Sequence, residues 1–354
     1  MTVLMSGATG FLGMALLREI ARRDQPVIAL IRGRDHAGRA ATLARRSGAA
    51  VESRCGDVRK PNWGLTDAEV AELTGRVRVV LSVAGDVGWS APWARLAETN
   101  IDGATHAAEL AAALGAKLIH AGSLYVGYDY GAEVGEVLLD EREHLTKYER
   151  AKLRGEWSVA RIARRADLRA FIVRIPALSG DLGPVPGGGD NGARKVPLSR
   201  LITSGRWPVL PYSTGARLDV CPRDLVAARV VELVDTEPTD LPEVRNIGQG
   251  AAAPIVEAFI REAAVASERE PRTFPRPVRL PASWLKAVSR QADRLNESPT
   301  NAAAIGLRYF ASRTVYTGAG LGREVSVRSL VRTLGMPLTE EPVRLNSYYS
   351  GWPA

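Results

Sequence analysis

Three residues near the middle of the chain have the types and the order needed to reduce a carbonyl group. They are Ser123, Tyr148 and Lys152. Tyr148 and Lys152 have the spacing that places two side chains on one face of a helix, one turn apart. A hydride that reaches a carbonyl carbon leaves negative charge on the oxygen, which then needs a hydrogen-bond donor and a proton donor. We therefore expect Ser123 to polarise the carbonyl and Tyr148 to donate the proton.

Lys152 has two expected roles. A tyrosine normally has a pKa of ~10, and a nearby ammonium group favours the phenolate and lowers that pKa. We expect Lys152 to act on Tyr148 in this way and to hold the nicotinamide ribose of a cofactor. Taken alone, a Tyr-x-x-x-Lys pair is common on helix surfaces, and a serine after a strand is usually a turn residue. The interpretation therefore depends on a cofactor site elsewhere in the chain.

The start of the chain predicts that cofactor site. Residues 2–5 and 27–31 are apolar runs typical of strands, and a helical pattern lies between them. In the intervening turn, Gly7 allows the tight turn, Gly10 lets the backbone approach a pyrophosphate, and Gly13 lets the helix pack closely on the sheet. The pyrophosphate would bind the N–H groups at the helix N-terminus. The residues expected to contact the cofactor here are Gly7, Thr9, Gly10, Phe11, Leu12 and Gly13. The alternative is a glycine-rich turn of another α/β protein.

Two arginines follow the second predicted strand. In such folds an acidic residue at this place binds the 2′-hydroxyl of the adenosine ribose, whereas an arginine accommodates a 2′-phosphate. The chain has Arg32 there and Arg34 close behind. This favours NADPH over NADH as the cofactor, and the alternative is a solvated pair of charges.

The rest of the pattern predicts an α/β fold. Further strands are expected at residues 49–51, 77–83, 117–120, 168–175 and 243–247. A helix that is interrupted around Asn100 is expected before the strand at 117–120. Strands that alternate with helices favour a doubly wound (Rossmann) parallel sheet, in which ligands bind at the carboxyl ends of the strands. Ser123 follows such an end. Ala84 and Gly85 follow another and are small enough for a cofactor to pass close by.

Two regions are expected to make up the molecule. We assign residues 1–178 and about 218–250 to an NADP-binding Rossmann domain. A smaller, mostly helical substrate-side subdomain would comprise about 179–217 and 251–354, laid over the carboxyl ends of the strands. Within it, the Gly/Pro-rich residues 179–193 predict a lid or binding loop. The Pro- and Arg-rich residues 269–281 predict an extended crossing without a regular element.

Composition excludes several classes of protein. Cys55 and Cys221 give neither a metal-ligand spacing nor a disulfide framework, so we expect no metal site and a reducing compartment. No apolar run approaches the ~18 residues of a spanning helix. The N-terminus enters a strand without the pattern of a signal peptide. We therefore expect a cytoplasmic protein.

The formal net charge is +8. The basic residues are spread along predicted helices and are not clustered with aromatic residues, which argues against nucleic acid as a partner. Most of this charge is interpreted as solvated surface. A second interpretation is attraction to an anionic partner such as a nucleotide, coenzyme A or an acidic carrier protein.

Five motifs together resemble the extended short-chain dehydrogenases/reductases. They are SGATGFLG at 6–13, GDV at 56–58, ETNIDG around Asn100, SLYVG at 123–127 and YERAK at 148–152. The resemblance implies that Asp57 accepts a hydrogen bond from the adenine amino group, with Val58 beside it, and that Asn100 supports the active site. It also implies cofactor contacts from Ile175 and Pro176.

Within that superfamily the chain most resembles the thioester reductase and fatty acyl-CoA reductase (male-sterility type) branch. The similar segments are residues 10–13, 62–65, 87–89 and 174–176, and residues 308–310 loosely resemble the tail of acyl reductases. Two positions depart from the branch. Residues 82–85 read Ser-Val-Ala-Gly where the branch has His-x-Ala-Ala, and Gly122 stands where a serine is common.

The resemblance implies NADPH-dependent reduction of an acyl thioester. The thioester would be bound to an acyl or peptidyl carrier protein or to coenzyme A, and its carbonyl would lie between Ser123 and Tyr148. Hydride transfer and loss of the thiol would give an aldehyde, which a second NADPH could carry to the alcohol. Neither cysteine is needed as a nucleophile. The alternatives are the same machinery acting on a ketone or a nucleotide-sugar, or a non-catalytic NADP sensor, which would need the glycines but not the three catalytic residues.

Overall fold

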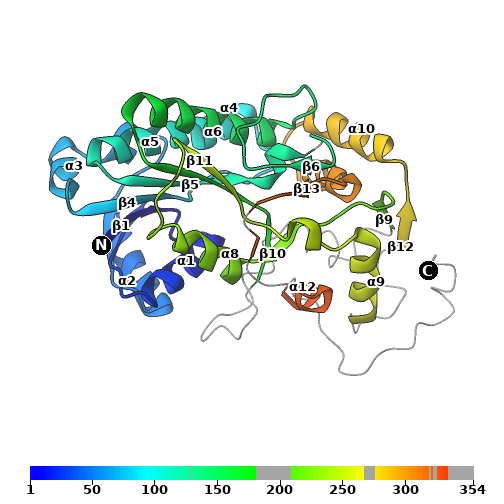
Figure 1. Cartoon of the computed structure of the whole chain (residues 1–354), viewed down its shortest axis with the longest axis horizontal. Coiled ribbons are helices and arrows are strands. Elements are labelled where there is room, and N and C mark those ends of the chain that lie inside the picture. Colours follow the sequence, from blue (N-terminus) through cyan, green and yellow to red (C-terminus); the bar gives the residue numbers. More distant parts are fainter. Residues whose placement is uncertain (129, 181–208, 267–275, 319, 322–324, 334–354) are drawn as a thin grey trace.

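The computed structural model describes the whole chain except residues 129, 181–208, 267–275, 319, 322–324 and 334–354 (Figure 1). The predicted lid at residues 179–193 lies outside the described residues from residue 181 onward.

A seven-stranded parallel sheet forms the centre of the molecule, in the order β11-β7-β5-β4-β1-β2-β3. Its strands are β1 (Thr2–Ser6), β2 (Val27–Ile31), β3 (Val51–Cys55), β4 (Val77–Ser82), β5 (Lys117–Ser123), β7 (Ala170–Ile175) and β11 (Glu243–Asn246). Strand order reverses between β1 and β4, which is the point where doubly wound sheets bind ligands. The predicted Rossmann fold is therefore confirmed.

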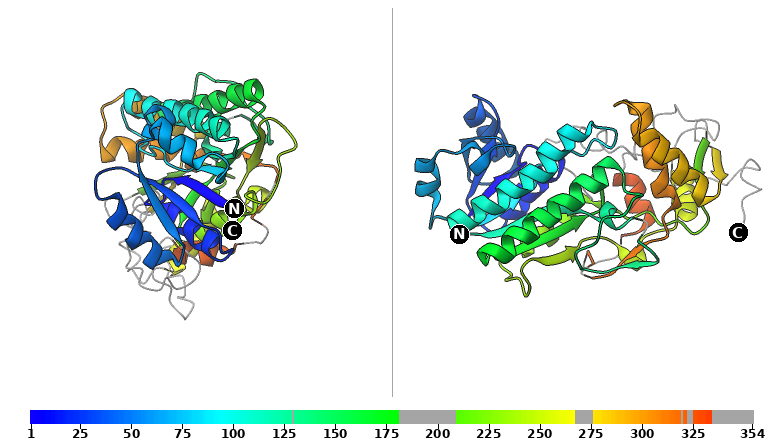
Figure 2. Two further views of the ribbon diagram at one scale, coloured as in Figure 1. Left: turned by 90° about the vertical axis from the view of Figure 1, so that its left-hand side faces the viewer. Right: turned by 90° about the horizontal axis from the view of Figure 1, so that it is seen from above.

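Helices cover both faces of the sheet (Figures 1 and 2). Below it in Figure 1 lie α1 (Phe11–Ala21), α2 (His36–Ser47) and α8 (Arg223–Glu232), which share one hydrophobic core with the sheet. Above it lie α3 (Asp67–Leu73), α5 (Gly103–Leu114) and α6 (Lys147–Ala166), which form the second core. All five residues of β2 are buried, as expected for a strand covered on both sides.

The helix predicted to be interrupted near Asn100 contains a π turn there. Helix α4 (Trp93–Ala97) passes into this π turn (Glu98–Asp102), which leads directly into α5. Helix α6 packs closely on the π turn. At Gly155 on α6 there is no room for a side chain, since a Cβ would collide with the Asn100 carbonyl oxygen. The close packing fixes α6, which carries Tyr148 and Lys152, against the segment that carries Asn100.

The C-terminal part of the chain is mostly helical, as predicted. It contains α9 (Val256–Ala266), α10 (Ala282–Asp293), α11 (Pro299–Gly306), the 3-10 turn η6 (Leu307–Ala311) and α12 (Val327–Thr333). Within the described residues, three short parallel pairings lie outside the main sheet: β10 (Val220–Pro222) with β8 (Ala177–Ser179), β12 (Arg276–Arg279) with β9 (Val209–Tyr212), and β13 (Val315–Tyr316) with β6 (Glu133–Val134).

Two local predictions were wrong. Residues 276–279 were expected to lack a regular element, but they form β12 by pairing with a segment distant in the sequence. The third strand of the sheet spans Val51–Cys55 and not residues 49–51. It is an edge strand of only intermediate burial, so its polar sequence lacks the apolar run that marks the central strands.

Candidate active site

The structure brings the three predicted catalytic residues together at the carboxyl end of β5. Ser123 is the last residue of β5, whereas Tyr148 and Lys152 lie in the first two turns of α6. All three are buried. The Ser123 hydroxyl is close enough to the Tyr148 phenol to affect its pKa, and the Lys152 ammonium donates to the Ala121 carbonyl oxygen at 2.6 Å.

Asn100 lies at the same place. Its Nδ2 donates to the Asp86 carbonyl oxygen at 2.9 Å, and its Oδ1 accepts from the Asp86 N–H at 3.1 Å. The amide therefore holds the segment that follows β4. A Cβ at Gly85 would lie 3.0 Å from Asn100 Oδ1 and 3.9 Å from Lys152 Nζ, so the end of β4, the π turn and α6 meet there.

Burial dominates the electrostatics of Tyr148. It raises the pKa of Tyr148 to about 12, although the nearby Ser123 hydroxyl opposes the shift. The Glu149 and Asp86 carboxylates raise the pKa further. The expected lowering by Lys152 is therefore not found in this structure. Burial lowers the pKa of Lys152 itself to about 8, against the attraction of Glu156. Near pH 7 Tyr148 is thus protonated, as a proton donor must be.

A buried histidine that was not among the predicted site residues lies beside Lys152. His120 is on β5, and its Nδ1 is 3.3 Å from the Ser82 hydroxyl oxygen. Its Nε2 has no hydrogen-bond partner within the described part of the chain. Burial, helped by the positive charge of Lys152, lowers the pKa of His120 to about 3. His120 is therefore neutral. A single histidine in an apolar strand does not by itself predict that its side chain lies beside Lys152.

The glycine turn fits the pyrophosphate of a dinucleotide. Gly7 has a φ of +76°, and a Cβ there would lie 2.7 Å from the Ala84 backbone nitrogen. A Cβ at Gly13 would collide with the Gly7 carbonyl oxygen. The Ser6 hydroxyl accepts hydrogen bonds from the backbone of Val83 and Ala84 at 3.1 and 3.2 Å, which holds β1 and β4 together. Gly10, the N-cap of α1, provides no side-chain cap, which leaves the first N–H groups of the helix for an anion.

Gly13→Ala is expected to weaken NADP(H) binding at least about tenfold, because the methyl group must displace the turn that binds the pyrophosphate. Gly135→Ala is the matched control, since a Cβ at Gly135 would meet only the Thr317 side chain, at 3.8 Å. Fluorescence titration with NADPH measures both variants. Equal affinity of the two would contradict the assignment of this turn to the cofactor.

The part of the cofactor site that is predicted to bind the adenosine contains one more basic residue than expected. Arg32 and Arg34 are exposed after β2. The Asp57 carboxylate pairs with Arg59, with Nη2–Oδ2 at 2.6 Å and Nε–Oδ1 at 3.0 Å. Hydrogen bonding to Arg59 lowers the pKa of Asp57, and the charge of Arg32 contributes. Arg32 and Asp57 are thus near each other, and the predicted adenine contact of Asp57 would be shared with Arg59.

The remaining predicted cofactor residues border the same region. Ile175 ends β7 and is the sheet neighbour of Ser123. Pro176 follows it and is buried. Val58 is buried after β3 and lies next to Gly103 at the start of α5, where a Cβ would be 3.6 Å from the valine side chain.

A fully buried ion pair supports the site. Arg174 on β7 and Glu156 on α6 are both 0% exposed, and Arg174 Nη2 lies 2.8 Å from Glu156 Oε2. The same nitrogen donates to the Val137 carbonyl oxygen at 2.9 Å. A Cβ at Gly122 would lie 2.8 Å from Glu156 Oε1. The departure from the common serine at position 122 therefore has a physical reason, because a side chain there would press on the buried carboxylate.

An aromatic wall, made of Trp89, Tyr125 and Tyr309, stands beside Tyr148. The rings of Tyr125 and Tyr309 are stacked with centroids 4.0 Å apart, and Trp89 lies 5.0 Å from Tyr309. Trp89 and Tyr125 pack against the cluster that contains Tyr148. The Tyr309 hydroxyl donates to Glu149 at 2.9 Å. In the sequence, residues 87–89 and 308–310 carry only a family resemblance, which does not predict that the two segments meet.

Neither cysteine is suited to form an acyl-enzyme. Cys221 is buried, and burial raises the pKa of its thiol well above the ordinary value. Cys55 is exposed on the edge strand β3. Among the described residues no cluster of three metal-ligating side chains occurs. No helix in the described ranges is long and apolar enough to cross a membrane.

The parallel sheet and its glycine turn are those of the extended short-chain dehydrogenases/reductases, a class of NAD(P)-dependent oxidoreductases. Within that class the chain belongs to the male sterility protein family, whose profile matches residues 5–230.

Two curated relatives are reductases. The L-2-aminoadipate reductase large subunit of Penicillium chrysogenum is 31% identical over 215 residues, which is 51% of this chain and 15% of that protein. The glycine betaine reductase ATRR of Emericella nidulans is 26% identical over 256 residues, 66% of this chain and 20% of that protein. The matched part of the chain thus spans a fifth or less of either relative's length.

Solved structures share the fold. The terminal R domain from the myxalamid PKS-NRPS biosynthetic pathway has a TM-score of 0.68 at 19% identity, covering 94% of this chain and 89% of that one. The reductase domain of a nonribosomal peptide synthetase from Mycobacterium tuberculosis has a TM-score of 0.62 at 15% identity, with 94% and 90% covered. A UDP-glucuronic acid 4-epimerase from Bacillus cereus has a TM-score of 0.58 at 20% identity, with 87% and 97% covered.

Proposed function

We propose that this protein uses NADPH to reduce an acyl thioester to an aldehyde. The observation that carries the proposal is the burial of Ser123 and Tyr148 at the carboxyl end of β5, where the Ser123 hydroxyl acts on the Tyr148 phenol. In this proposal Ser123 is the polarising donor and Tyr148 is the protonated phenol. The two curated relatives, both named as reductases, support a reductive reaction.

The chain's own residues would act on the thioester carbonyl. NADPH, when bound, supplies the hydride. Ser123 polarises the carbonyl, and Tyr148 donates a proton to the oxygen as charge develops, which gives a hemithioacetal. Collapse of the hemithioacetal expels the thiol and leaves the aldehyde. Lys152, held by the Ala121 carbonyl, and Asn100, which fixes the segment after β4, position the cofactor side of the site.

The donor is proposed to be an acyl or peptidyl carrier protein or coenzyme A. Two structural neighbours support this class of substrate: one is named as the terminal R domain of a PKS-NRPS pathway, and the other as the reductase domain of a nonribosomal peptide synthetase. The aromatic wall beside Tyr148 offers an apolar surface to an acyl chain. Reduction of the aldehyde to the alcohol by a second NADPH needs no additional group.

The second candidate is the same set of catalytic residues acting on a ketone or a nucleotide-sugar, which the similarity to an epimerase structure supports.

One set of assays distinguishes the two candidates. NADPH oxidation is measured with octanoyl thioesters of pantetheine, coenzyme A and a carrier protein, with ketones, and with UDP-glucose. Epimerisation of UDP-glucose is followed by analysis of its products. Thioester-dependent NADPH oxidation that releases octanal is the expected result. Conversion of UDP-glucose with no thioester turnover would replace our proposal by the second candidate.

Arg32→Ala is expected to raise the KM for NADPH about tenfold or more and to leave the KM for NADH nearly unchanged. A charge-assisted contact with the 2′-phosphate is worth about 1.5–3 kcal/mol, and NADH lacks that group. Arg45→Ala is the matched control, because Arg45 is an exposed arginine on α2 that bonds only to Thr42 among the contacts described. Equal losses for the two cofactors would reject the 2′-phosphate role of Arg32.

A further inference from the structure

One arginine, Arg95 on α4, makes ion pairs both with the segment that follows β4 and with the C-terminal part of the chain. Its Nε lies 2.6 Å from Oδ2 of Asp86, in the segment after β4. Its Nη1 and Nη2 donate to the two carboxylate oxygens of Glu297, at 2.9 and 2.7 Å, and Glu297 lies between α10 and α11. A bidentate pair of this kind has a defined geometry. Arg95 therefore holds the two segments in a fixed relation.

The segment after β4 belongs to the candidate active site. The Asn100 side chain binds both backbone groups of Asp86, and the Asp86 carboxylate accepts from the Gly88 N–H at 2.8 Å. Burial raises the pKa of Tyr148 most, and the Asp86 carboxylate raises it further. Arg95 is thus one contact away from a residue that acts on the proposed proton donor.

The same segment carries Trp89, a member of the aromatic wall, and the C-terminal part holds this ring. A Cβ at Gly306, the last residue of α11, would collide with the Trp89 ring. The Ser90 hydroxyl donates to the Ser298 carbonyl oxygen at 3.1 Å, and Ser298 directly follows Glu297. The position of Trp89 in the candidate site therefore depends on how the two segments are held together.

The pair of Arg95 and Glu297 is expected to matter for geometry more than for stability. The two side chains are 46% and 43% exposed, and an exposed ion pair contributes little to the stability of a fold. A displacement of about 1 Å at a reacting group, in contrast, can lower a rate about 10²-fold. Loss of this pair should therefore change the kinetics and leave the folding nearly unchanged.

We propose that Arg95 is a positioning residue of the candidate active site. It ties the segment after β4 to Glu297 and thereby fixes Asp86 and Trp89 in place. The inference rests on the proposed thioester reduction, in which the aromatic wall receives the acyl chain. Arg95 itself contacts neither the cofactor nor the acyl group. Its loss weakens acyl binding and slows the reduction, while NADPH binding at the glycine turn is retained.

Hydrogen–deuterium exchange followed by mass spectrometry tests this coupling without requiring turnover. The variants are Arg95→Gln and Glu297→Gln, and the second changes only the C-terminal side of the contact. We expect both variants to increase the exchange rate of residues 86–90 at least about tenfold, because the segment then opens more often. The exchange of α1, which carries the glycine turn, should stay at the wild-type rate.

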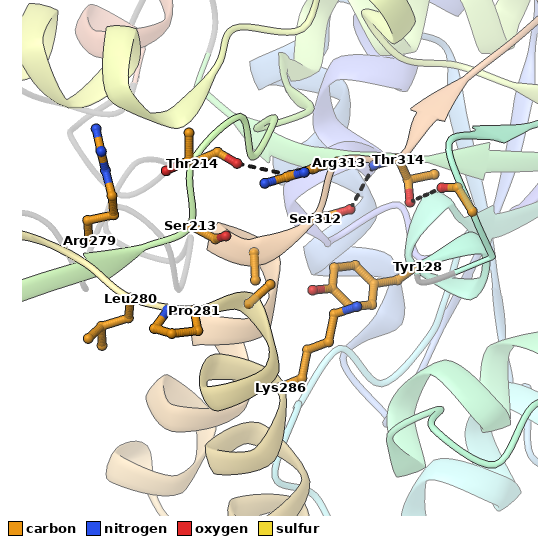
Figure 3. Close-up of a pocket in the computed structure, with 13 residues that line it drawn as sticks. Tyr128, Ser213, Thr214, Arg279, Leu280, Pro281, Lys286, Ser312, Arg313 and Thr314 are labelled. Carbon is orange, nitrogen blue, oxygen red and sulfur yellow. Dashed lines mark hydrogen bonds between the residues drawn. The ribbon is translucent and has the colours of Figure 1, made fainter. Parts of the chain in front are cut away.

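Arg313→Gln is the matched control. Arg313 also lies in the C-terminal part, where its Nε donates to the Thr214 carbonyl oxygen at 2.9 Å and its side chain lines a cavity of about 700 Å³ (Figure 3). In this variant the exchange of residues 86–90 should match the wild type. An equal increase in Arg313→Gln would overturn the inference, because it would reflect a general loosening of the C-terminal part.

Steady-state kinetics with octanoyl-pantetheine extends the test to the reaction. Arg95→Gln is expected to raise the KM for the thioester and to lower kcat, each about fivefold or more, and to change the Kd of NADPH less than about twofold. The double variant Arg95→Gln/Glu297→Gln should be no slower than Arg95→Gln, because both substitutions remove one and the same contact.

Two further results would overturn the inference. One is unchanged exchange of residues 86–90 in Arg95→Gln, and the other is a double variant whose losses are the product of those of the single variants. Failure of the proposed function is recognised separately. If the exchange increases as expected but the wild type reduces no thioester, the positioning role of Arg95 stands and the thioester proposal fails.

Discussion

Tyr148→Phe is expected to lower kcat for thioester reduction by about 10²–10⁴-fold. The change removes the proton donor and its interaction with the Ser123 hydroxyl, but it keeps the ring that packs with Ala91 and Leu96. NADPH affinity should therefore remain nearly unchanged. Single-turnover NADPH oxidation measures the rate, and fluorescence titration measures the binding.

Tyr212→Phe is the control for that variant, because Tyr212 is a buried tyrosine on β9 that is not part of the candidate site. Its kcat should match the wild type. If Tyr148→Phe kept more than about a tenth of the wild-type kcat, the phenol would not be the proton donor. A loss of NADPH binding in Tyr148→Phe would instead indicate that the substitution disturbs the fold of the site.

Arg174→Met is expected to lower the free energy of unfolding by about 3–5 kcal/mol. Arg174 and Glu156 are both 0% exposed, so the variant leaves a carboxylate buried without its partner. The double variant Arg174→Met/Glu156→Leu should recover part of the loss, because it removes both charges. Urea denaturation followed by circular dichroism gives these free energies.

The exposed pair Arg229–Glu232 is the control for the buried pair. Its atoms are 2.6 Å apart, but the two side chains are 31% and 45% exposed, so Arg229→Met should cost at most about 1 kcal/mol. A loss in Arg174→Met no larger than that of Arg229→Met would contradict the view that the buried pair supports α6 and β7. A double variant less stable than Arg174→Met would contradict the expectation that the unpaired Glu156 carboxylate causes the loss.

The sheet and the cofactor turn could be predicted because their signals are local. An apolar run such as residues 27–31 marks a buried parallel strand by itself, and its bounds match those of β2. Gly7 and Gly13 are required by backbone contacts within one βαβ unit, so their spacing in the sequence is informative. The interruption of the helix at Asn100 was also visible locally and proved to be a π turn.

What could not be predicted depends on contacts between distant segments. Glu156 occupies a charged position on an amphipathic helix, and only the fold buries it against Arg174. Tyr309 meets Tyr125 across the two parts of the chain. The direction of the Tyr148 pKa shift could not be predicted for the same reason. The sequence shows a nearby lysine, but it does not show the burial of Tyr148, which raises the pKa.

The destination of the hydride tests the central proposal most directly. Wild-type protein is incubated with octanoyl-pantetheine and NADPH that carries deuterium at C4. The two stereospecifically labelled forms of NADPH are used in separate reactions. The products are analysed by mass spectrometry. We predict that one of the two forms places one deuterium on C1 of octanal, or two on C1 of octanol, and that Tyr148→Phe forms this product far more slowly. Oxidation of NADPH that leaves C1 of the acyl group unlabelled with both forms would contradict thioester reduction by this protein.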